Sequence, residues 1–249
     1  MGQLQDRTAV VTGATSGIGL ASARRFAAEG AHVFITGRRK DALDKAIAEI
    51  GADVVGIQGD VANLADLDQL FATVEQSGRR IDVLFANAGG GSFRRLADID
   101  ERHFDGIFAT NVKGLLFTVQ KALPLLNDRA SIILTGSTNA SVGHEAFGVY
   151  GASKAAVRSF SRTWANELKE RRIRVNTLTP GPTDTPGITG LAPDADQAAQ
   201  LKGLLASQVP LGRMGSPDEI ASAVLFLASD QSSFITGSEL FVDGGLNQV

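Results

Sequence analysis

The residues best suited to chemistry lie in the second half of the chain, where Tyr150 and Lys154 are four positions apart. The stretch around them has helical spacing, so both side chains share one face of a helix and can approach the same ligand. A phenol with a pKa of about 10 is a poor acid or base at neutral pH, whereas a neighbouring ammonium stabilises the phenolate and lowers that pKa. The pair therefore predicts an acid–base centre in which Lys154 tunes Tyr150.

A third polar group, Ser137, follows the apolar run at 131–135 and is predicted to stand at the end of a strand. From there its hydroxyl can donate a hydrogen bond to a carbonyl oxygen of a ligand, the same oxygen that Tyr150 would protonate. Two donors aimed at an oxygen that gains charge during a reaction stabilise the transition state. Each residue alone has an ordinary explanation, as a packing tyrosine, a surface lysine or a serine that bonds at a strand end. Chemistry is indicated only by the three together.

The composition of the 249 residues excludes several classes of function. The chain carries 24 basic and 27 acidic residues, a formal charge of -3, so it lacks the basic surface that nucleic acid requires. It contains no cysteine, which removes disulfides and thiolate chemistry, and its histidines, His32, His103 and His144, form no ligand-spaced cluster. We expect no metal site and no nucleic-acid partner.

The sequence also lacks the features of a membrane or secreted protein. No apolar run approaches the roughly 18 residues needed to cross a bilayer, and the N-terminal sequence has neither the basic start nor the apolar stretch of a signal peptide. We therefore expect a cytoplasmic protein that makes no membrane contact.

Short apolar, β-branched runs alternate with stretches of helical spacing along the chain. The predicted strands are residues 8–11, 32–36, 53–57, 81–86, 131–135, 174–178 and 239–242. The predicted helices are residues 18–29, 40–50, 65–76, 104–126, 149–171 and 217–228. This alternation indicates an α/β fold, with one doubly wound, Rossmann-type domain over residues 1–249 and a parallel sheet of about seven strands covered by helices on both faces.

One late region breaks the alternation. Between Pro180 and Pro217 the chain is punctuated by prolines that frame a short Asp/Ala/Gln-rich segment. Long insertions of this kind are commonly functional loops. We predict a substrate loop or lid at about 182–213.

A glycine-rich turn joins the first predicted strand to the first predicted helix. Its glycines have a GxxxGxG spacing, which is neither the GxGxxG fingerprint nor a Walker loop. Glycines permit close approach of backbone to a pyrophosphate, and the helix N-terminus supplies free N–H groups and a favourable dipole. The alternative is a bare strand-to-helix turn. As a nucleotide site the turn would comprise Gly13, Thr15, Ser16, Gly17, Ile18 and Gly19.

The end of the second predicted strand indicates which dinucleotide is bound. An acidic residue about 20 residues after the glycine turn would bind the ribose of NAD, but Arg38 and Arg39 stand there instead. Guanidinium groups suit a 2′-phosphate, so NADP(H) is favoured and NAD(H) stays possible; the alternative is a solvated arginine pair at the start of a helix. Asp60 and Val61, after the third strand, are candidates to contact adenine, unless Asp60 caps the next helix.

These motifs, in this order, resemble the short-chain dehydrogenase/reductase family over essentially the full length of the chain. TGATSGIG at 12–19 resembles the family's TGxxxGxG, Asp60-Val61 its adenine contact, Asn87-Ala88-Gly89-Gly90 its NAG element, Pro180-Gly181 followed by Thr185 its nicotinamide-side loop, and Asp243-Gly244-Gly245 its usual C-terminal sequence. The chain also resembles the family in its catalytic tetrad, which would be Asn111, Ser137, Tyr150 and Lys154. Ser137 precedes Tyr150 by the family's usual 13 residues.

The resemblance implies an oxidoreductase that moves hydride between nicotinamide and a carbonyl or secondary alcohol, with Tyr150 as acid and base. It implies that Asn111 holds a proton-relay water behind Lys154. The expected cofactor contacts from this half of the chain are Asn87, Ala88, Gly89, Tyr150, Lys154, Pro180, Gly181, Thr183 and Thr185, although the threonines could make local turn bonds instead. The candidate substrate contacts are Ser137, Asn139, His144 and Phe147, with Phe93 as a further apolar wall. His144 is otherwise a satisfied loop histidine, and the two phenylalanines are otherwise core residues.

The substrate itself is left open at this point. A broad carbonyl reductase and a sugar, polyol or steroid alcohol dehydrogenase all fit the resemblance. Another candidate is a 3-oxoacyl thioester, with Arg129, Arg171 and Arg172 meeting an acidic acyl carrier protein. A hypothesis of a different class is a non-catalytic NADP(H) sensor that kept the fold. The resemblance also implies a homotetramer or homodimer in which the helices at 104–126 and 149–171 pair.

Overall fold

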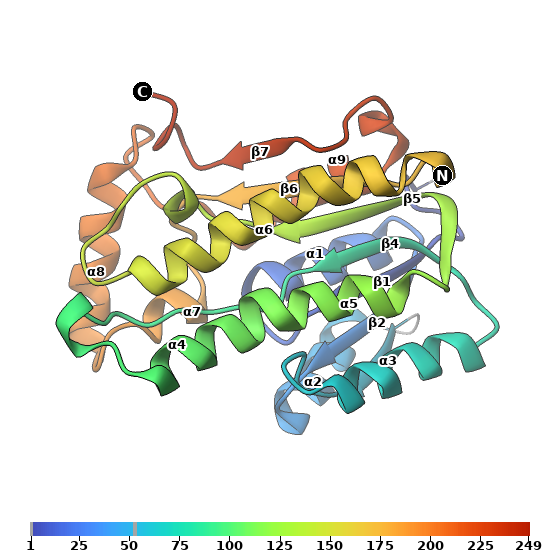
Figure 1. Ribbon diagram of the computed structural model, residues 1–249, viewed down its shortest axis with the longest axis horizontal. Coiled ribbons are helices and arrows are strands. Elements are labelled where there is room, and N and C mark those ends of the chain that lie inside the picture. Colours follow the sequence, from blue (N-terminus) through green and yellow to red (C-terminus); the bar gives the residue numbers. More distant parts are fainter. Residues whose placement is uncertain (1, 52–53) are drawn as a thin grey trace.

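The computed structural model describes residues 2–51 and 54–249 and contains one parallel sheet of seven strands in the order β3-β2-β1-β4-β5-β6-β7 (Figure 1). The strands are β1 (Thr8–Thr12), β2 (His32–Gly37), β3 (Val54–Gln58), β4 (Ile81–Ala86), β5 (Leu126–Thr135), β6 (Arg174–Pro180) and β7 (Glu239–Val242). The predicted doubly wound α/β fold is confirmed. Because the strand order reverses between β1 and β4, the crevice for a ligand is expected at the carboxyl ends of these two strands.

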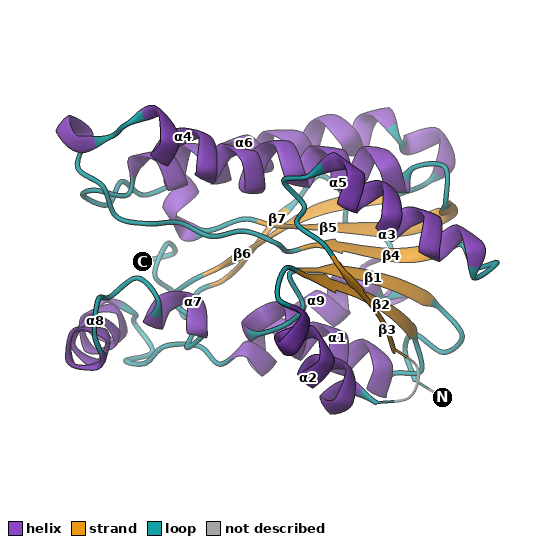
Figure 2. Cartoon of the chain, turned by 90° about the horizontal axis from the view of Figure 1, so that it is seen from below, coloured by secondary structure: helices purple, strands orange, loops and turns teal. Residues whose placement is uncertain are grey.

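Helices cover both faces of the sheet (Figure 2). They are α1 (Gly17–Ala28), α2 (Lys40–Ile50), α3 (Leu64–Gln76), α4 (Glu101–Phe108), α5 (Leu115–Ala122), α6 (Gly148–Glu167), α7 (Pro186–Thr189), α8 (Ala195–Gln208) and α9 (Pro217–Ala228). On one face α1, α2 and α9 bury Phe26 and Val224, and on the other α3 to α6 bury Leu70 and Val157. Adjacent strand residues enter opposite cores, which explains why strands such as β1 read as continuous apolar runs.

Two predicted helices and one predicted strand have different boundaries in the structure. The helix predicted at 104–126 is divided into α4, a π-helical segment at Ala109–Gly114, and α5. It begins earlier, because the Asp100 side chain accepts a hydrogen bond of 2.7 Å from the His103 N–H and caps α4. It also ends earlier, because Pro124 interrupts the helix and β5 begins at Leu126 rather than at 131. The helix predicted at 149–171 ends at Glu167 and continues only as a 3₁₀ turn at Lys169–Arg171.

The strand predicted at 53–57 corresponds to β3, and position 53 lies outside the described residues. Across residues 2–51 and 54–249, no helix combines the length and the apolar character that a membrane span requires.

The predicted lid segment at 182–213 contains the short α7 and the longer α8, which stand beyond the carboxyl ends of the strands (Figure 1). Asp194 begins α8 by accepting a hydrogen bond of 2.8 Å from the Gln197 N–H. Lys202 of α8 pairs with Asp184 at 2.6 Å, which ties the helix back to the segment that leaves β6. The segment therefore forms one wall of the space above the sheet, and its motion as a lid stays a prediction.

Candidate active site

Two adjoining cavities lie at the carboxyl ends of the strands, with volumes of about 470 and 350 Å³. Both are lined by Gly13 and Ser16 of the glycine turn and by Ala88 and Gly89, which follow β4. The cavities thus meet at the point where the strand order reverses. Ser137, Tyr150 and Lys154 line the larger cavity, and Arg38 and Asp60 line the smaller one.

The glycine turn is shaped for close approach of a ligand. Gly13 and Gly17 have φ values of +64° and +56°, which favour glycine. A Cβ atom on Gly13 would lie 2.8 Å from the Ala88 Cα, and one on Gly19 would lie 2.3 Å from the Gly13 carbonyl oxygen. Ser16 is the N-cap of α1, yet its side chain makes no capping hydrogen bond. The first N–H groups of α1 therefore have no side-chain cap, and because Gly17 and Ile18 line the larger cavity, this end of the helix fits a pyrophosphate.

The smaller cavity contains the candidate residues for the adenosine half of a dinucleotide. Thr15, Arg38, Asp60 and Val61 line it, whereas Arg39 is the N-cap residue of α2 and is not among the described lining residues. Asp60 does not cap α3, whose N-cap is Asn63, although its Oδ1 accepts a hydrogen bond of 3.0 Å from the Ala62 N–H ahead of that helix. Of the two arginines, the geometry favours Arg38 for contact with a 2′-phosphate.

Asn87 holds three strand ends together at the junction of the cavities. Its Nδ2 donates to the carbonyl oxygens of Thr12 and Gly13, each at 3.1 Å, and its Oδ1 accepts from the Thr135 hydroxyl at 3.3 Å. The neighbouring Ala88 N–H donates to the Thr12 hydroxyl at 3.0 Å. Asn87 was predicted as a cofactor contact, and it does line the larger cavity, but its amide is used to fix the glycine turn.

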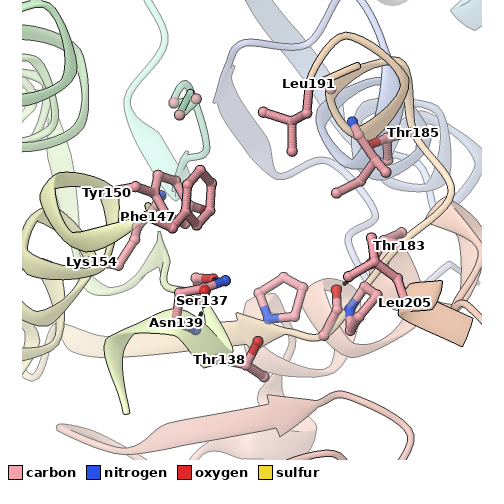
Figure 3. Close-up of a pocket in the computed structure, with 18 of the residues that line it drawn as sticks. Ser137, Thr138, Asn139, Phe147, Tyr150, Lys154, Thr183, Thr185, Leu191 and Leu205 are labelled. Atoms are coloured by element: carbon pink, nitrogen blue, oxygen red, sulfur yellow. Dashed lines mark hydrogen bonds between the residues drawn. The ribbon is translucent and has the colours of Figure 1, made fainter. Parts of the chain in front are cut away.

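The predicted acid–base pair is brought together by α6. Lys154 is 2% exposed, its Nζ lies 5.7 Å from the centre of the Tyr150 ring, and it donates a hydrogen bond of 2.8 Å to the Thr135 carbonyl oxygen. Ser137, just beyond β5, is buried and lines the same cavity. Figure 3 shows the Tyr150 and Lys154 side chains on one wall, with Ser137 and Asn139 below them.

Burial shifts the pKa values of both groups of this pair. It raises the pKa of the Tyr150 phenol above the ordinary value of 10.0, and a hydrogen bond with Ser137 opposes that rise without cancelling it. Burial also lowers the pKa of the Lys154 ammonium from 10.5 to about 8. The Tyr150 pKa thus moves in the direction opposite to the expected one, because desolvation of the phenolate is the largest cause and Lys154 is not among the causes of the shift. Tyr150 is therefore a neutral phenol at neutral pH, the form that donates a proton.

Asn111 lies behind the pair rather than in the described lining of either cavity. It sits in the π-helical segment and is 1% exposed. Its Oδ1 accepts from the Gly90 N–H at 3.0 Å, and its Nδ2 donates to the Gly90 carbonyl oxygen and the Ser153 hydroxyl, each at 2.9 Å. Asn111 thus positions the Gly89-Gly90 segment, where a Cβ on Gly89 would lie 3.3 Å from the Lys154 Nζ. A relay water held by Asn111 stays a prediction.

The loop after β6 forms the opposite wall through Pro180, Gly181, Thr183 and Thr185. Both threonines make the local turn bonds foreseen as their alternative: the Thr183 hydroxyl donates to the Gly181 carbonyl oxygen at 3.0 Å, and Thr185 caps α7. A Cβ on Gly181 would lie 2.7 Å from the Asp243 Cα. The C-terminal Asp-Gly-Gly sequence therefore supports this loop from behind.

The candidate substrate residues Asn139, His144 and Phe147 line the larger cavity, as does Phe93. His144 is a satisfied loop histidine, because its Nδ1 lies 2.8 Å from the Asn139 Oδ1. The sequence analysis did not identify the apolar side chains of the lid segment as cavity-lining residues. The helical spacing of the leucines in α8 was the signal that could have indicated them. The missed apolar lining residues of this segment are Ile188, Leu191, Leu201, Leu204 and Leu205, and Leu246, which follows β7, was missed as well.

Two of the arginines considered for a carrier protein lie at the end of the sheet where β5 and β6 begin. Arg171 donates to the carbonyl oxygens of Leu123 and Leu126 at 3.0 and 2.7 Å, where β5 begins, and Arg172 precedes β6. The cavities lie where these strands end, and the seven residues of β6 alone correspond to about 20 Å. Arg171 and Arg172 are therefore distant from the cavities of their own chain, and a contact of Arg129, Arg171 and Arg172 with a carrier protein stays a prediction.

No group of three His, Cys, Asp or Glu side chains within the described ranges is arranged to hold a metal ion.

Comparison with known proteins identifies close similarities over the whole chain. Residues 13–247 match the family model described as "Enoyl-(Acyl carrier protein) reductase". The chain is 45% identical over 249 residues to the oxidoreductase asL5 of Sarocladium schorii, covering 99% of this chain and 98% of that protein. It is 37% identical to the 3-oxoacyl-[acyl-carrier-protein] reductase FabG of Thermotoga maritima, covering 98% and 99% of the two chains.

Two further similarities concern the cofactor and the fold. The chain is 36% identical to the NADP-dependent (R)-specific alcohol dehydrogenase of Lentilactobacillus kefiri, covering 98% of this chain and 97% of that protein. The crystal structure of a "Short-chain dehydrogenase/reductase SDR:Glucose/ribitol dehydrogenase" from Brucella melitensis superposes with a TM-score of 0.93 at 31% identity, covering 100% of both chains.

Proposed function

The chain belongs to the short-chain dehydrogenase/reductase family of oxidoreductases, and from this premise we propose that it uses NADP(H) to interconvert a ketone and a secondary alcohol. The observation that carries the proposal is the cavity that Tyr150 shares with Ser137 and Lys154, which the glycine turn also lines. The positive φ at Gly13 and the uncapped start of α1 support a bound dinucleotide.

The chemistry divides between cofactor and protein. The bound nicotinamide would supply or accept the hydride. In reduction the Tyr150 hydroxyl would give its proton to the carbonyl oxygen, and the Ser137 hydroxyl would donate a second hydrogen bond to that oxygen as it gains charge. In oxidation Tyr150 would take the proton back. Lys154, fixed to the Thr135 carbonyl oxygen, would supply positive charge beside the phenolate form.

The preference for NADP(H) is supported by Arg38, which lines the cavity proposed for the adenosine half and is exposed to a ligand there. The similarity to an NADP-dependent alcohol dehydrogenase supports the same preference. The cofactor would also contact Thr15, Ser16 and Ile18 of the turn, and Pro180, Thr183 and Thr185 of the opposite loop.

Replacing Arg38 with Asp is expected to weaken NADPH binding by about 10- to 100-fold and to leave NADH binding within about twofold, because a charge-assisted bond to the 2′-phosphate is lost. Fluorescence titration of the reduced cofactors measures both affinities. Arg39→Asp is the matched control, since it makes the same charge change one residue outside the cavity lining. Equal losses of NADPH affinity in the two variants would contradict the assignment.

A second candidate function is reduction of a 3-oxoacyl thioester on a carrier protein, which the similarity to the Thermotoga maritima reductase favours. A spectrophotometric assay compares the candidates by following NADPH and NADH consumption with ketones, aldehydes, sugars and an acetoacetyl thioester, and NADP⁺ reduction with secondary alcohols. We expect turnover with a ketone that is faster with NADPH. Tight NADPH binding without turnover of any compound would favour the sensor hypothesis.

We also propose that the enzyme works in the cytoplasm as a homotetramer or homodimer, which the family resemblance supports.

A further inference from the structure

The larger cavity has an aromatic wall that leads to the reacting hydroxyl. The rings of Phe93 and Phe147 have centroids 4.7 Å apart with an interplanar angle of 37°, and those of Phe147 and Tyr150 are 4.4 Å apart with an angle of 30°. All three line the cavity. Gly91 packs against the wall, because a Cβ there would lie 2.6 Å from the Tyr150 Cδ2 and 2.9 Å from the Phe147 Cζ. The rings therefore form a continuous, tilted stack beside the site of proton transfer.

An aliphatic wall stands on the other side of this cavity. Leu191 follows α7, and Leu201, Leu204 and Leu205 come from α8. Leu204 is 57% exposed, so it presents apolar surface to the solvent-accessible space. Figure 3 shows Phe147 and Tyr150 on one side of the cavity, with Leu191, Thr185 and Leu205 on the other. We call the space between the aromatic and the aliphatic wall the slot (Figure 3), and apolar walls on two sides fit a flat, apolar group.

The charges around the slot do not suit an anionic substrate. Lys154 is the cation among the described lining residues, and its Nζ is committed to the Thr135 carbonyl oxygen. Glu145, which also lines the cavity, pairs with Arg95 at 3.0 Å, and the flanking cations Arg94 and Lys202 pair with Asp100 and Asp184 at 3.7 and 2.6 Å. These cations are already balanced by carboxylates, so they offer no basic surface to an acidic carrier protein.

We propose that the substrate is a neutral ketone that carries an aromatic ring on its carbonyl, and that Phe93 and Phe147 select it by stacking. This rests on the proposed function, because the carbonyl must reach Tyr150 and Ser137 while the ring lies along the wall. Aromatic stacking adds to the burial of apolar area, so it discriminates a flat aromatic ring from an aliphatic group of similar size.

The test compares kcat/KM for 2-acetylnaphthalene with kcat/KM for cyclohexyl methyl ketone. We expect at least a 10-fold preference for the aryl ketone in the native protein, and a loss of about 3- to 10-fold of that preference in Phe147→Leu and in Phe93→Leu. Phe104→Leu is the matched control, because Phe104 is 43% exposed, close to the 44% of Phe93, but stacks on Phe108 away from the cavity. A preference that Phe147→Leu and Phe93→Leu leave unchanged would overturn the proposal.

Calorimetric binding of 2-acetylnaphthalene to the NADPH complex of Tyr150→Phe separates this proposal from the proposed function, because it needs no turnover. Ring-dependent binding that Phe147→Leu weakens would support the slot even if no ketone were reduced. Turnover of ketones without any ring-dependent difference in kcat/KM or affinity would refute the slot and leave the proposed function standing.

A different observation concerns the direction of the Ser137 hydroxyl. The Ser137 Oγ accepts hydrogen bonds from both the backbone N–H and the side-chain Nδ2 of Asn139, each at 3.2 Å. A serine oxygen has two acceptor positions, so both are occupied. Its O–H is left as a donor, which bonds to Tyr150 in this structure and can bond to a substrate oxygen placed beside it. The Asn139 amide is oriented in turn by its Oδ1, which lies 2.8 Å from the His144 Nδ1. These contacts form one chain from His144 through Asn139 to Ser137.

The geometry points to Asn139 and His144 as positioning residues that keep Ser137 a hydrogen-bond donor to the substrate oxygen. Neither is placed as a group that reacts. His144 would act from the exposed end of the chain, through the tautomer that carries its proton on Nδ1. The effect of either side chain should therefore depend on the presence of the Ser137 hydroxyl.

A double-mutant cycle tests this dependence. Asn139→Ala and His144→Ala are expected to lower kcat by about 3- to 10-fold with Ser137 present, and by less than 2-fold in the Ser137→Ala background, while the KM for NADPH stays unchanged. His144 is exposed, so its variant gives a result even if Asn139→Ala folds poorly. Equal losses of kcat in both backgrounds would show that the two residues act independently of Ser137 and would overturn the inference.

Discussion

Replacing Tyr150 with Phe is expected to lower kcat for ketone reduction by about 1000-fold, because general acid catalysis by a positioned group is worth roughly 10²- to 10⁴-fold and Tyr150 is the proposed proton donor. The phenylalanine ring keeps the packing against Phe147, whose ring centroid lies 4.4 Å away. The affinity for NADPH is therefore expected to change by less than about twofold. Steady-state assays and cofactor titration measure the two effects separately.

Tyr150→Phe removes only the hydroxyl group of this side chain and keeps its ring. Removal of one buried hydroxyl should leave the melting temperature near that of the native protein, since the phenol is not a partner in the packing of the sheet. A Tyr150→Phe variant that retained a tenth or more of the native kcat would refute the assignment of Tyr150 as the acid.

Replacing Lys154 with Met is expected to lower kcat by about 100-fold or more, because the positive charge next to the phenolate form of Tyr150 is lost. NADPH affinity should fall as well, since Lys154 lines the cavity beside Gly89. Lys121→Met is the control, because Lys121 also forms a charged contact, with Asp68 on α3, but far from the cavity lining. Comparable losses of kcat in the two variants would contradict the role given to Lys154.

The pKa of Lys154 gives this prediction a pH dependence. With a folded pKa of about 8, the ammonium is lost as the pH rises through 8, so the native rate of reduction should decline there and the variant should lack that limb. The folded protein destabilises the charged form of Lys154, so stability changes with pH in the opposite direction to that of a lysine whose charged form the fold stabilises. A depressed lysine pKa means that the unfolded state binds more protons, so stability rises with pH between about 8 and 10.5.

It follows that loss of activity in Lys154→Met should not reflect unfolding. Below pH 8 the buried ammonium costs about 3 kcal/mol, estimated from the shift of its pKa, so Lys154→Met should unfold with an equal or larger free energy than the native protein. Chemical denaturation at pH 7 measures this difference. A marked loss of stability would show that Lys154 holds the structure rather than the chemistry.

The order of the elements could be predicted from the sequence because the strands are buried on both faces. Val10 and Val11 enter different cores, so a parallel strand reads as an unbroken apolar run that the sequence shows directly. The division of the helix predicted at 104–126 could not be predicted. Its π-helical segment places Asn111 against Gly90 and Ser153, and these partners are 21 and 42 residues away in sequence.

The candidate site was predicted where its motif is local and was incomplete where its partners are distant. Tyr150, Lys154 and the glycine turn are short-range patterns, and the structure places them in one cavity. The predicted direction of the Tyr150 pKa shift was wrong, because a sequence shows a neighbouring lysine but not the burial that raises this pKa. The side-chain bonds of Asn87 to the glycine turn span 74 and 75 residues, so its structural use could not be foreseen.

The most direct test of hydride transfer at this site uses NADPH that carries deuterium at the transferable C4 position. The native protein is incubated with this cofactor and an aryl ketone, and the alcohol product is analysed by mass spectrometry and NMR. We predict one deuterium on the carbinol carbon, with formation of the labelled product about 1000-fold slower in Tyr150→Phe. Product without deuterium at that carbon, or equal rates with and without the Tyr150 hydroxyl, would contradict hydride transfer with Tyr150 as the proton donor.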